Sequence, residues 1–347
     1  MIGLLLMCIP YFKEYRMESG VIASVDMMTV TGKFCVHPDI WNNAFKKACR
    51  FSLGWDEWIS AKMCSYRYQY KFTCYDGCAF WVGIGFNSYQ DSWTDTANHW
   101  RIEFNPNKVF KSAEFLHVYS VLLGFSRTRI DGINNKHFVD ADYLKLVECT
   151  RFDLAVDYPV PRSSCFLVKD LRTYSEHTNS IEDRTQYLGQ RSNHGFVKLY
   201  NKQIESKLPI PFTRLELTVD YKQRMWRDVE KIFPKVYVVE KYQLEFDDLK
   251  LTDTDRFILF ACLENPDSIK MLGRKQKKKT ECILAKYTRF LEIDKKAHAH
   301  ILTVLDDFVN PYFVADMMGE YGKHWLQTER IFNWGFVENC VEGENDV

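Results

Sequence analysis

Three segments of the chain repeat one pattern, in which an arginine and a carboxylate are separated by a single apolar residue. They are residues 101–104 (RIEF), 151–154 (RFDL) and 214–217 (RLEL). Side chains of a β-strand alternate between its two faces, so the arginine and the acid of each segment would share one face. The same face of the two longer segments would add Asp157 and Asp220. Paired in one sheet, these strands would gather carboxylates on one face, although plain cross-strand ion pairs worth roughly 0.2–1 kcal/mol would leave the same pattern.

A fourth segment places a tyrosine between two lysines. Lys198, Tyr200 and Lys202 would share one face of a strand. Lysine side chains bind phosphate and make a phenolate easier to form. Carboxylates without histidine or cysteine partners suit hard ions with oxygen ligands, here Mg²⁺ or Mn²⁺. A tyrosine, basic groups and a divalent metal together favour phosphoryl transfer through a phosphotyrosine intermediate.

The elements that would position these residues form an α+β fold. Alternation of aromatic and polar residues predicts a strand at 66–75, and further strands are predicted at 80–86, 150–158, 195–201 and 212–220. Helical spacing of apolar residues predicts helices at 38–50, 113–123, 221–233, 252–263 and 282–308. We therefore expect a mostly antiparallel sheet flanked by helices to about residue 235, followed by a helical C-terminal region at 236–347.

The composition is that of a globular protein with a large core. Of 347 residues, 46% are apolar, and 25 Phe, 19 Tyr and 9 Trp argue against a disordered chain. No apolar run reaches the roughly 18–20 residues that a membrane span needs, so no membrane partner is expected. Eleven cysteines without any Cys-x-x-Cys pair favour reduced, buried thiols in the cytoplasm over a zinc site or a disulfide scaffold.

The charges balance in total but not along the chain. Residues 265–300 hold 10 Lys or Arg against 4 Asp or Glu, whereas residues 301–347 hold 9 acidic residues against 2 basic ones. A basic stretch followed by an acidic tail indicates a surface that binds a polyanion, with the tail weakening that attraction. Two differently solvated helix faces would give the same distribution.

Residues 1–16 are an extension whose role the sequence leaves open. Met1–Phe12 is apolar, and Lys13 and Arg16 follow it, which is not the order of a secretory signal. We interpret Met17 as the true initiator, which would begin the catalytic domain at residues 17–235. An interfacial helix is the alternative.

The motifs resemble those of the Rep_trans replication initiation factors, which act in rolling-circle plasmids, phages and conjugative elements. The matching pieces are TRFDLAVD (150–157), YLGQRSNHGFVKLYNK (187–202) and FTRLELTVD (212–220), with a fainter match at WRIEFNPNKV (100–109). Their order and spacing agree with the family over roughly residues 20–235, and the three together are specific. One position departs from the pattern, since Gln190 stands where the family often has Ser.

The resemblance implies a metal-dependent DNA nicking and closing enzyme that initiates rolling-circle replication. A tyrosine would attack a phosphodiester of the origin, keep the 5′ phosphate and free a 3′-OH for the host polymerase. Tyr200 is the expected nucleophile, with Tyr187 as a second candidate. The remaining carried-over residues would bind Mg²⁺ or Mn²⁺ (Asp153, Asp157 and Glu216) or phosphate (Arg191, Lys198 and Lys202). The expected partners are double-stranded origin DNA, single-stranded nick-site DNA, a second copy of the chain, and host helicase and polymerase.

The C-terminal region offers a second expected DNA contact. With a nickase in the same chain, the basic run at 270–279 is expected to meet DNA phosphates rather than to form a solvated loop, through Arg274, Lys275, Lys277, Lys278 and Lys279. The one His-x-His pair, His298 and His300, falls within a predicted helix. Residues two apart on a helix do not face each other, so no metal site is expected there.

Two alternatives share the same core. A relaxase of an integrative conjugative element would use the same catalytic residues, but the first 65 residues are too short and strand-rich for the helical module that such relaxases often carry. A non-catalytic DNA-binding repressor on the same fold belongs to a different class. The presence of Tyr200 and the carboxylates disfavours the repressor.

Overall fold

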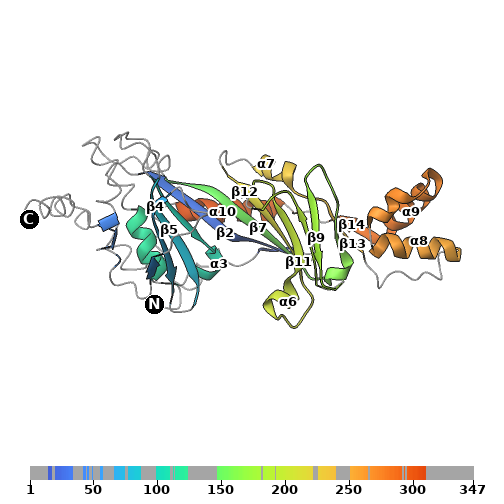
Figure 1. The fold of residues 1–347 in the computed structure, drawn as a ribbon, viewed down its shortest axis with the longest axis horizontal. Coiled ribbons are helices and arrows are strands. Elements are labelled where there is room, and N and C mark those ends of the chain that lie inside the picture. Colours follow the sequence, from blue (N-terminus) through green and yellow to red (C-terminus); the bar gives the residue numbers. More distant parts are fainter. Residues whose placement is uncertain are drawn as a thin grey trace, which may run out of the picture.

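The computed structural model of the chain describes residues 15–17, 20–33, 42–43, 45–46, 49, 55–57, 66–74, 77–86, 99–109, 112, 114–123, 147–180, 183–191, 193–221, 226–239, 251–264, 266–290, 293 and 295–309. These residues form an α+β structure dominated by one antiparallel sheet, as the sequence predicts (Figure 1). The acidic tail beyond residue 309 and nearly all of residues 1–16 lie outside the described part.

The N-terminal half of the main sheet is built from six strands. Its connections include α3 (Pro106–Val109) and a helix at residues 114–123, the latter within the range that the sequence predicts. Of the helix predicted at 38–50, positions 42–43 and 45–46 are helical. The strands are β1 (Tyr15–Arg16), β2 (Ile22–Lys33), β3 (Trp55–Glu57), β4 (Tyr66–Thr73), β5 (Ala79–Phe86) and β6 (His99–Phe104).

The second half repeats this plan. Five strands belong to the main sheet, and the helices α6 (Lys202–Ser206) and α7 (Trp226–Ile232) are attached to it. The predicted strands at 150–158, 195–201 and 212–220 are confirmed with small changes of their bounds. The strands are β7 (Val147–Tyr158), β9 (Tyr174–Thr178), β10 (Arg184–Leu188), β11 (Val197–Asn201) and β12 (Thr213–Asp220).

The strand order of the main sheet reads the same from either edge when equivalent strands are matched. The order is β3-β4-β5-β6-β2-β7-β12-β11-β10-β9, with β1 paired to β2. The long strands β2 and β7 meet in the middle, and every strand pair is antiparallel. In each half, the last strand along the chain pairs with the first long strand: β6 pairs with β2, and β12 pairs with β7. The strand β6 of one half therefore corresponds to β12 of the other.

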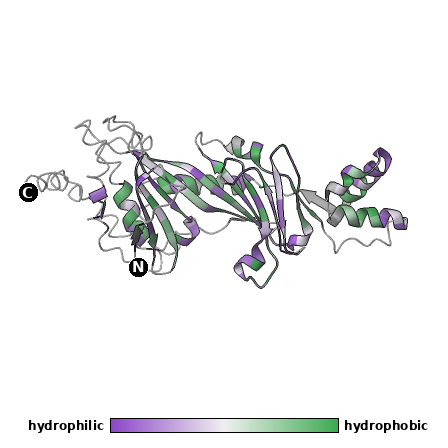
Figure 2. Cartoon of the chain, in the orientation of Figure 1, coloured by the Kyte–Doolittle hydropathy of each residue, from purple (hydrophilic) through white to green (hydrophobic). Residues whose placement is uncertain are grey.

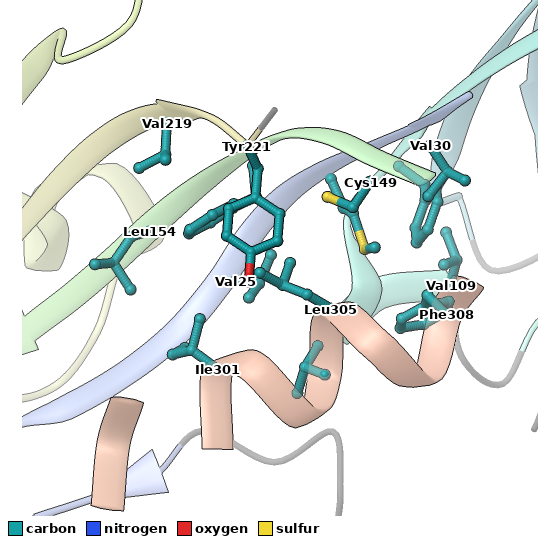
Figure 3. Close-up of a cluster of buried hydrophobic side chains, with 14 of the residues drawn as sticks. Val25, Val30, Val109, Cys149, Leu154, Val219, Tyr221, Ile301, Leu305 and Phe308 are labelled. Atoms are coloured by element: carbon teal, nitrogen blue, oxygen red, sulfur yellow. The ribbon is translucent and has the colours of Figure 1, made fainter. Parts of the chain in front are cut away.

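One face of the sheet carries the core. Figure 2 shows hydrophobic and hydrophilic residues interspersed along the strands, as expected when only one face of a sheet is covered. The covering helix is α10 (Lys295–Val309), whose buried Ile301 and Leu305 point toward Val25 and Leu154 of the two central strands (Figure 3). The hydroxyl of Tyr119, on the helix at 114–123, donates to the carbonyl of Phe308. The opposite face is left to polar side chains.

The region after residue 235 is not wholly helical, which corrects the prediction. It contains β13 (Val236–Val239), α8 (Asp253–Glu264), the 3₁₀ segment η6 (Pro266–Met271), α9 (Arg274–Tyr287) and β14 (Thr288–Phe290). The helix predicted at 282–308 is two helices, because residues 288–290 pair with β13, which also pairs with β8 (Cys165–Leu167). Helical spacing of apolar residues cannot reveal such a pairing. Among the described residues, no helix is long and apolar enough to cross a membrane.

Candidate active site

The predicted polar face forms where β7, β12, β11 and β10 lie side by side. The register places Glu216 of β12 opposite Lys198 of β11, which in turn lies opposite Tyr187 of β10. The neighbouring row contains Tyr200, Arg214 and Asp157. The third repeat of the Arg-x-acid pattern, residues 101–104, lies in β6 beyond β2 and does not join this cluster.

Arg214 and Asp157 form a buried ion pair with two parallel hydrogen bonds. Nε and Nη2 of Arg214 each donate to a different carboxylate oxygen of Asp157 at 2.6 Å. Nη1 lies 3.1 Å from Oδ1 of Asp26 on β2. Burial lowers the pKa of Arg214, but the hydrogen bonds and charge of Asp157 outweigh burial, so the pKa rises overall. The negative charge of Asp157 is therefore balanced by the guanidinium of Arg214.

Breaking this ion pair should strongly destabilise the protein. Asp157→Leu alone leaves a buried guanidinium with only partial compensation and should lower the free energy of unfolding by about 3–5 kcal/mol. Replacing both partners, with Asp157→Leu and Arg214→Met, should lower it by clearly less. Urea unfolding measures both values, and Asp170→Asn, at the more exposed Arg172–Asp170 pair, is the control with an expected loss below about 1 kcal/mol. An Asp157→Leu loss as small as that of the control would contradict the assignment.

Asp26 is a site residue that the sequence analysis missed. The register between β2 and β7 shifts between Val25 and Met27, so Asp26 is the extra residue of a β-bulge. Bulges re-aim side chains, and this one directs Asp26 to Nη1 of Arg214 and to Nδ2 of Asn105 at 3.2 Å. The surrounding sequence is apolar, and no signal within one strand announces a bulge; only the pairing with β7 reveals it.

Three carboxylates crowd the polar face beside the ion pair. Burial raises the pKa of Asp153, and the nearby charges of Arg151 and Asp26 act in opposite directions on it. Burial also raises the pKa of Glu216; the hydrogen bond from Tyr200 lowers it and the charge of Asp26 raises it. The described residues contain no group of three or more His, Cys, Asp or Glu arranged to hold a metal ion. Carboxylate oxygens are the ligands that Mg²⁺ and Mn²⁺ prefer, and both oxygens of Asp157 already accept hydrogen bonds from Arg214.

Tyr200 is enclosed by carboxylates. Its hydroxyl is 2.7 Å from Oε1 of Glu216 and 3.1 Å from Oε2 of Glu205, so its single O–H can donate to either carboxylate. The residue is only 5% exposed, and the ammonium of Lys198 lies 3.8 Å from the centre of its ring. Burial and the charge of Glu216 raise the pKa of Tyr200 well above its ordinary value. The surroundings therefore favour the neutral phenol.

Tyr187 stands on the same face in a different setting. Its side chain is half-buried, and its ring stacks on Phe196 with the ring centres 6.0 Å apart. Its cross-strand neighbour is Lys198, whose ammonium is 4.0 Å from Oε2 of Glu216. Within the described part of the chain, no carboxylate accepts a hydrogen bond from the Tyr187 hydroxyl. Of the two candidate tyrosines, Tyr187 is the more exposed.

The expected DNA contacts are divided between two places. Arg191 is exposed in the turn after β10, near the polar face. Residues 274–279 of the basic run form the first part of α9, where Arg274, Lys275 and Lys278 are exposed. Lys279 differs from these neighbours, because its ammonium lies 2.5 Å from Oδ2 of the buried Asp255.

The structure also places the histidines His298, His300 and His194. His298 and His300 lie in α10, as the helix prediction requires. Nδ1 of His194 accepts a hydrogen bond from the backbone N–H of Asp220 at 3.0 Å, so this nitrogen is occupied in ordering the end of β12.

Comparison with solved structures finds a likeness to a replication protein. A solved structure described as a rolling circle replication initiator protein from Geobacillus stearothermophilus matches with 16% identity over 84% of this chain and 97% of that chain, at a TM-score of 0.33. No family model and no curated protein matches the chain. A TM-score of this size carries no argument, so the chemistry has to rest on the residues of this chain.

Proposed function

We propose that this protein is a tyrosine nickase that initiates rolling-circle replication. The observation that carries the proposal is the row of Tyr187, Lys198 and Glu216 on three adjacent strands, beside the carboxylates of Asp153 and Asp26. A partly exposed phenol, an ammonium and clustered carboxylates on one polar face supply a nucleophile, a phosphate contact and oxygen ligands. The resemblance of these segments to replication initiation factors supports the same reading.

The reaction needs one bond to form and one to break. The phenol oxygen, having lost its proton, attacks the phosphorus of a DNA phosphodiester and forms a phosphotyrosine bond to the 5′ side. The bond from phosphorus to the 3′ oxygen breaks, and that oxygen takes up a proton to become a free 3′-OH. Attack by a 3′-OH on the phosphotyrosine reverses both changes and closes the strand.

We assign the attack to Tyr187 rather than to Tyr200, the residue that the sequence favours. Tyr200 would have to give up a proton while its hydroxyl faces Glu216 and Glu205, which makes a phenolate there costly. Tyr187 stands opposite Lys198 in the register of β10 and β11, so a positive charge that attracts phosphate lies on the same face. Tyr200 then acts as a positioning residue, because its hydrogen bond fixes the Glu216 carboxylate.

The proposed metal site would form from Asp26, Asp153 and Glu216 when the DNA phosphate binds, because these carboxylates are not arranged to hold an ion without it. A bound Mg²⁺ or Mn²⁺ would act as a Lewis acid toward the phosphate oxygens. The chain's own contribution is to hold these carboxylates on one face, with Arg151 and Lys198 at the edges of the cluster. Asp157 keeps a structural role through Arg214.

The basic helix α9 should add affinity for DNA without sequence preference. Each phosphate contact that is lost should lower the slope of log affinity against log salt by about one. Lys275→Gln with Lys278→Gln should therefore lower the slope by about two. Lys279→Gln is the control and should leave the slope near the original value, because its ammonium is paired with Asp255. Fluorescence anisotropy with a duplex at several salt concentrations measures the slope; equal slopes for all three proteins would show that α9 is merely solvated.

The proposal is tested by trapping the covalent intermediate. The full chain is incubated with circular single-stranded DNA carrying a random insert and Mg²⁺, denatured, and separated by electrophoresis. We expect a fraction of the DNA to remain attached to the protein, and sequencing of that fraction identifies the nick site. DNA binding without any covalent product under these conditions would instead support a non-catalytic DNA-binding repressor.

A further inference from the structure

The connection between β11 and β12 forms a finger that projects beyond the ends of these strands. We define the finger as residues 202–212, which include α6 (Figure 1). Its side chains Ile204 and Ile210 are 52% and 53% exposed. Single exposed apolar residues are common on protein surfaces, but two on one short projection beside a candidate active site call for a physical explanation.

The finger is held in shape by its own hydrogen bonds. The Asn201 side chain accepts from the backbone N–H of Ile204 at 3.1 Å and so caps α6. Lys207 ends the helix with a φ of 52°, a left-handed conformation that is uncommon for a side-chain-bearing residue. The backbone N–H of Lys202 donates to the carbonyl of Phe212 at 2.9 Å and closes the base. The finger therefore presents its isoleucines in a defined position.

The base of the finger belongs to the candidate active site. Glu205 of α6 lies 3.1 Å from the Tyr200 hydroxyl, and the ammonium of Lys202 is bonded to the same carboxylate. Lys207, at the end of α6, is exposed. A DNA strand held against the polar face would thus meet a projection that carries apolar side chains and an exposed positive charge.

We propose that the finger is a wedge that separates the two DNA strands next to the nick, with Ile204 and Ile210 packing against the last base pair. The inference rests on the proposed nickase function and adds how that site gains access to an unpaired strand. Apolar side chains, isoleucine among them, are inserted between base steps by many DNA-bending proteins, and unstacking one step costs about a few kcal/mol. The exposed Lys207 would contact the phosphates beside the opened pair.

The test compares nicking of single-stranded and duplex forms of the sequence recovered from the covalent product. The test variant carries both Ile204→Ser and Ile210→Ser. One control is Leu171→Ser, which changes a fully exposed leucine at the opposite end of these strands. The other control carries both Ile204→Leu and Ile210→Leu. The serine variant should nick the single strand at the original rate but nick the duplex about tenfold more slowly or worse, because unstacking costs a few kcal/mol. A duplex with a mismatched bubble at the site should restore its rate, and both controls should nick the duplex normally.

A second readout does not depend on chemistry. A duplex with 2-aminopurine beside the nick site should become more fluorescent when the full chain binds, and the serine variant should lose that increase. Unchanged duplex nicking and fluorescence in the serine variant would overturn the wedge while leaving the nickase function standing. Failure of the unaltered protein to nick even the single strand would overturn the function, and the wedge with it. A serine variant that also loses single-strand nicking would show that the finger serves the catalytic site itself.

Discussion

Tyr187→Phe should abolish the covalent protein–DNA product, whereas Tyr200→Phe should still form it. Phenylalanine keeps the aromatic ring, so the stacking of residue 187 on Phe196 and the packing of residue 200 survive while each hydroxyl is lost. Loss of the Tyr187 hydroxyl removes the attacking atom. Loss of the Tyr200 hydroxyl removes a hydrogen bond to Glu216, which should slow the reaction without stopping it. Denaturing electrophoresis with a labelled nick-site oligonucleotide measures both.

The opposite result has a clear meaning. If Tyr187→Phe forms the product and Tyr200→Phe does not, Tyr200 is the nucleophile, as its place between two lysines in the sequence suggests. The carboxylates around Tyr200 would then have to move away when DNA binds. Urea unfolding of both variants shows whether either loss comes from a failure to fold.

The strands of the active site could be predicted because their faces are chemically distinct. In β7 and β12, residues on one side are apolar and buried, while arginines and acids alternate on the other side. A period of two residues is a local property, so it can be read without knowing which strands are neighbours. The prediction that Tyr200, Arg214 and Asp157 share a face followed from this periodicity.

What each polar side chain contacts could not be predicted, because contacts depend on register. The sequence makes Asp157 and Glu216 look equivalent, yet one is neutralised by Arg214 and the other accepts from Tyr200. Lys279 looks like its basic neighbours until α8 brings Asp255 against it. Asp26 enters the site only through a shift in the pairing of β2 with β7.

The symmetric strand order explains why the Arg-x-acid pattern occurs in a strand outside the site. Arg101 and Glu103 of β6 occupy the place that Arg214 and Glu216 occupy in β12. Opposite Arg101 stands Gly83, where the second half has Tyr200 opposite Arg214. A Cβ at Gly83 would lie 2.7 Å from Cγ of Tyr66, so the ring of Tyr66, the first residue of β4, fills that space. The N-terminal half thus keeps the arginine and acid of the plan, but its phenol comes from β4 and not from β5, the strand that pairs with β6.

Removal of divalent metal should abolish nicking. Substitution of Glu216, and not of Asp157, should weaken binding of the metal. Chelation by EDTA is expected to reduce the rate by about a hundredfold or more, since a Lewis-acid ion contributes several kcal/mol, and added Mg²⁺ or Mn²⁺ should restore it. The crowding of Asp26, Asp153 and Glu216 gives the reason, because burial raises the pKa of Asp153 and Glu216 and a cation would relieve that cost.

Binding of Mn²⁺, followed by calorimetry or electron paramagnetic resonance, tests the ligand set without any nicking reaction. Glu216→Gln should weaken Mn²⁺ binding by about tenfold or more, because the charge of the ligands sets the affinity. The paired change of Asp157→Leu with Arg214→Met should leave Mn²⁺ binding at least as tight. The change removes a carboxylate whose charge Arg214 already balances, and it also removes the cation nearest Asp26. Loss of Mn²⁺ binding in the paired variant, with folding intact, would return Asp157 to the ligand set that the sequence predicts. Full nicking in EDTA would remove the metal from the mechanism and leave Lys198 and Arg191 as the groups that contact the phosphate.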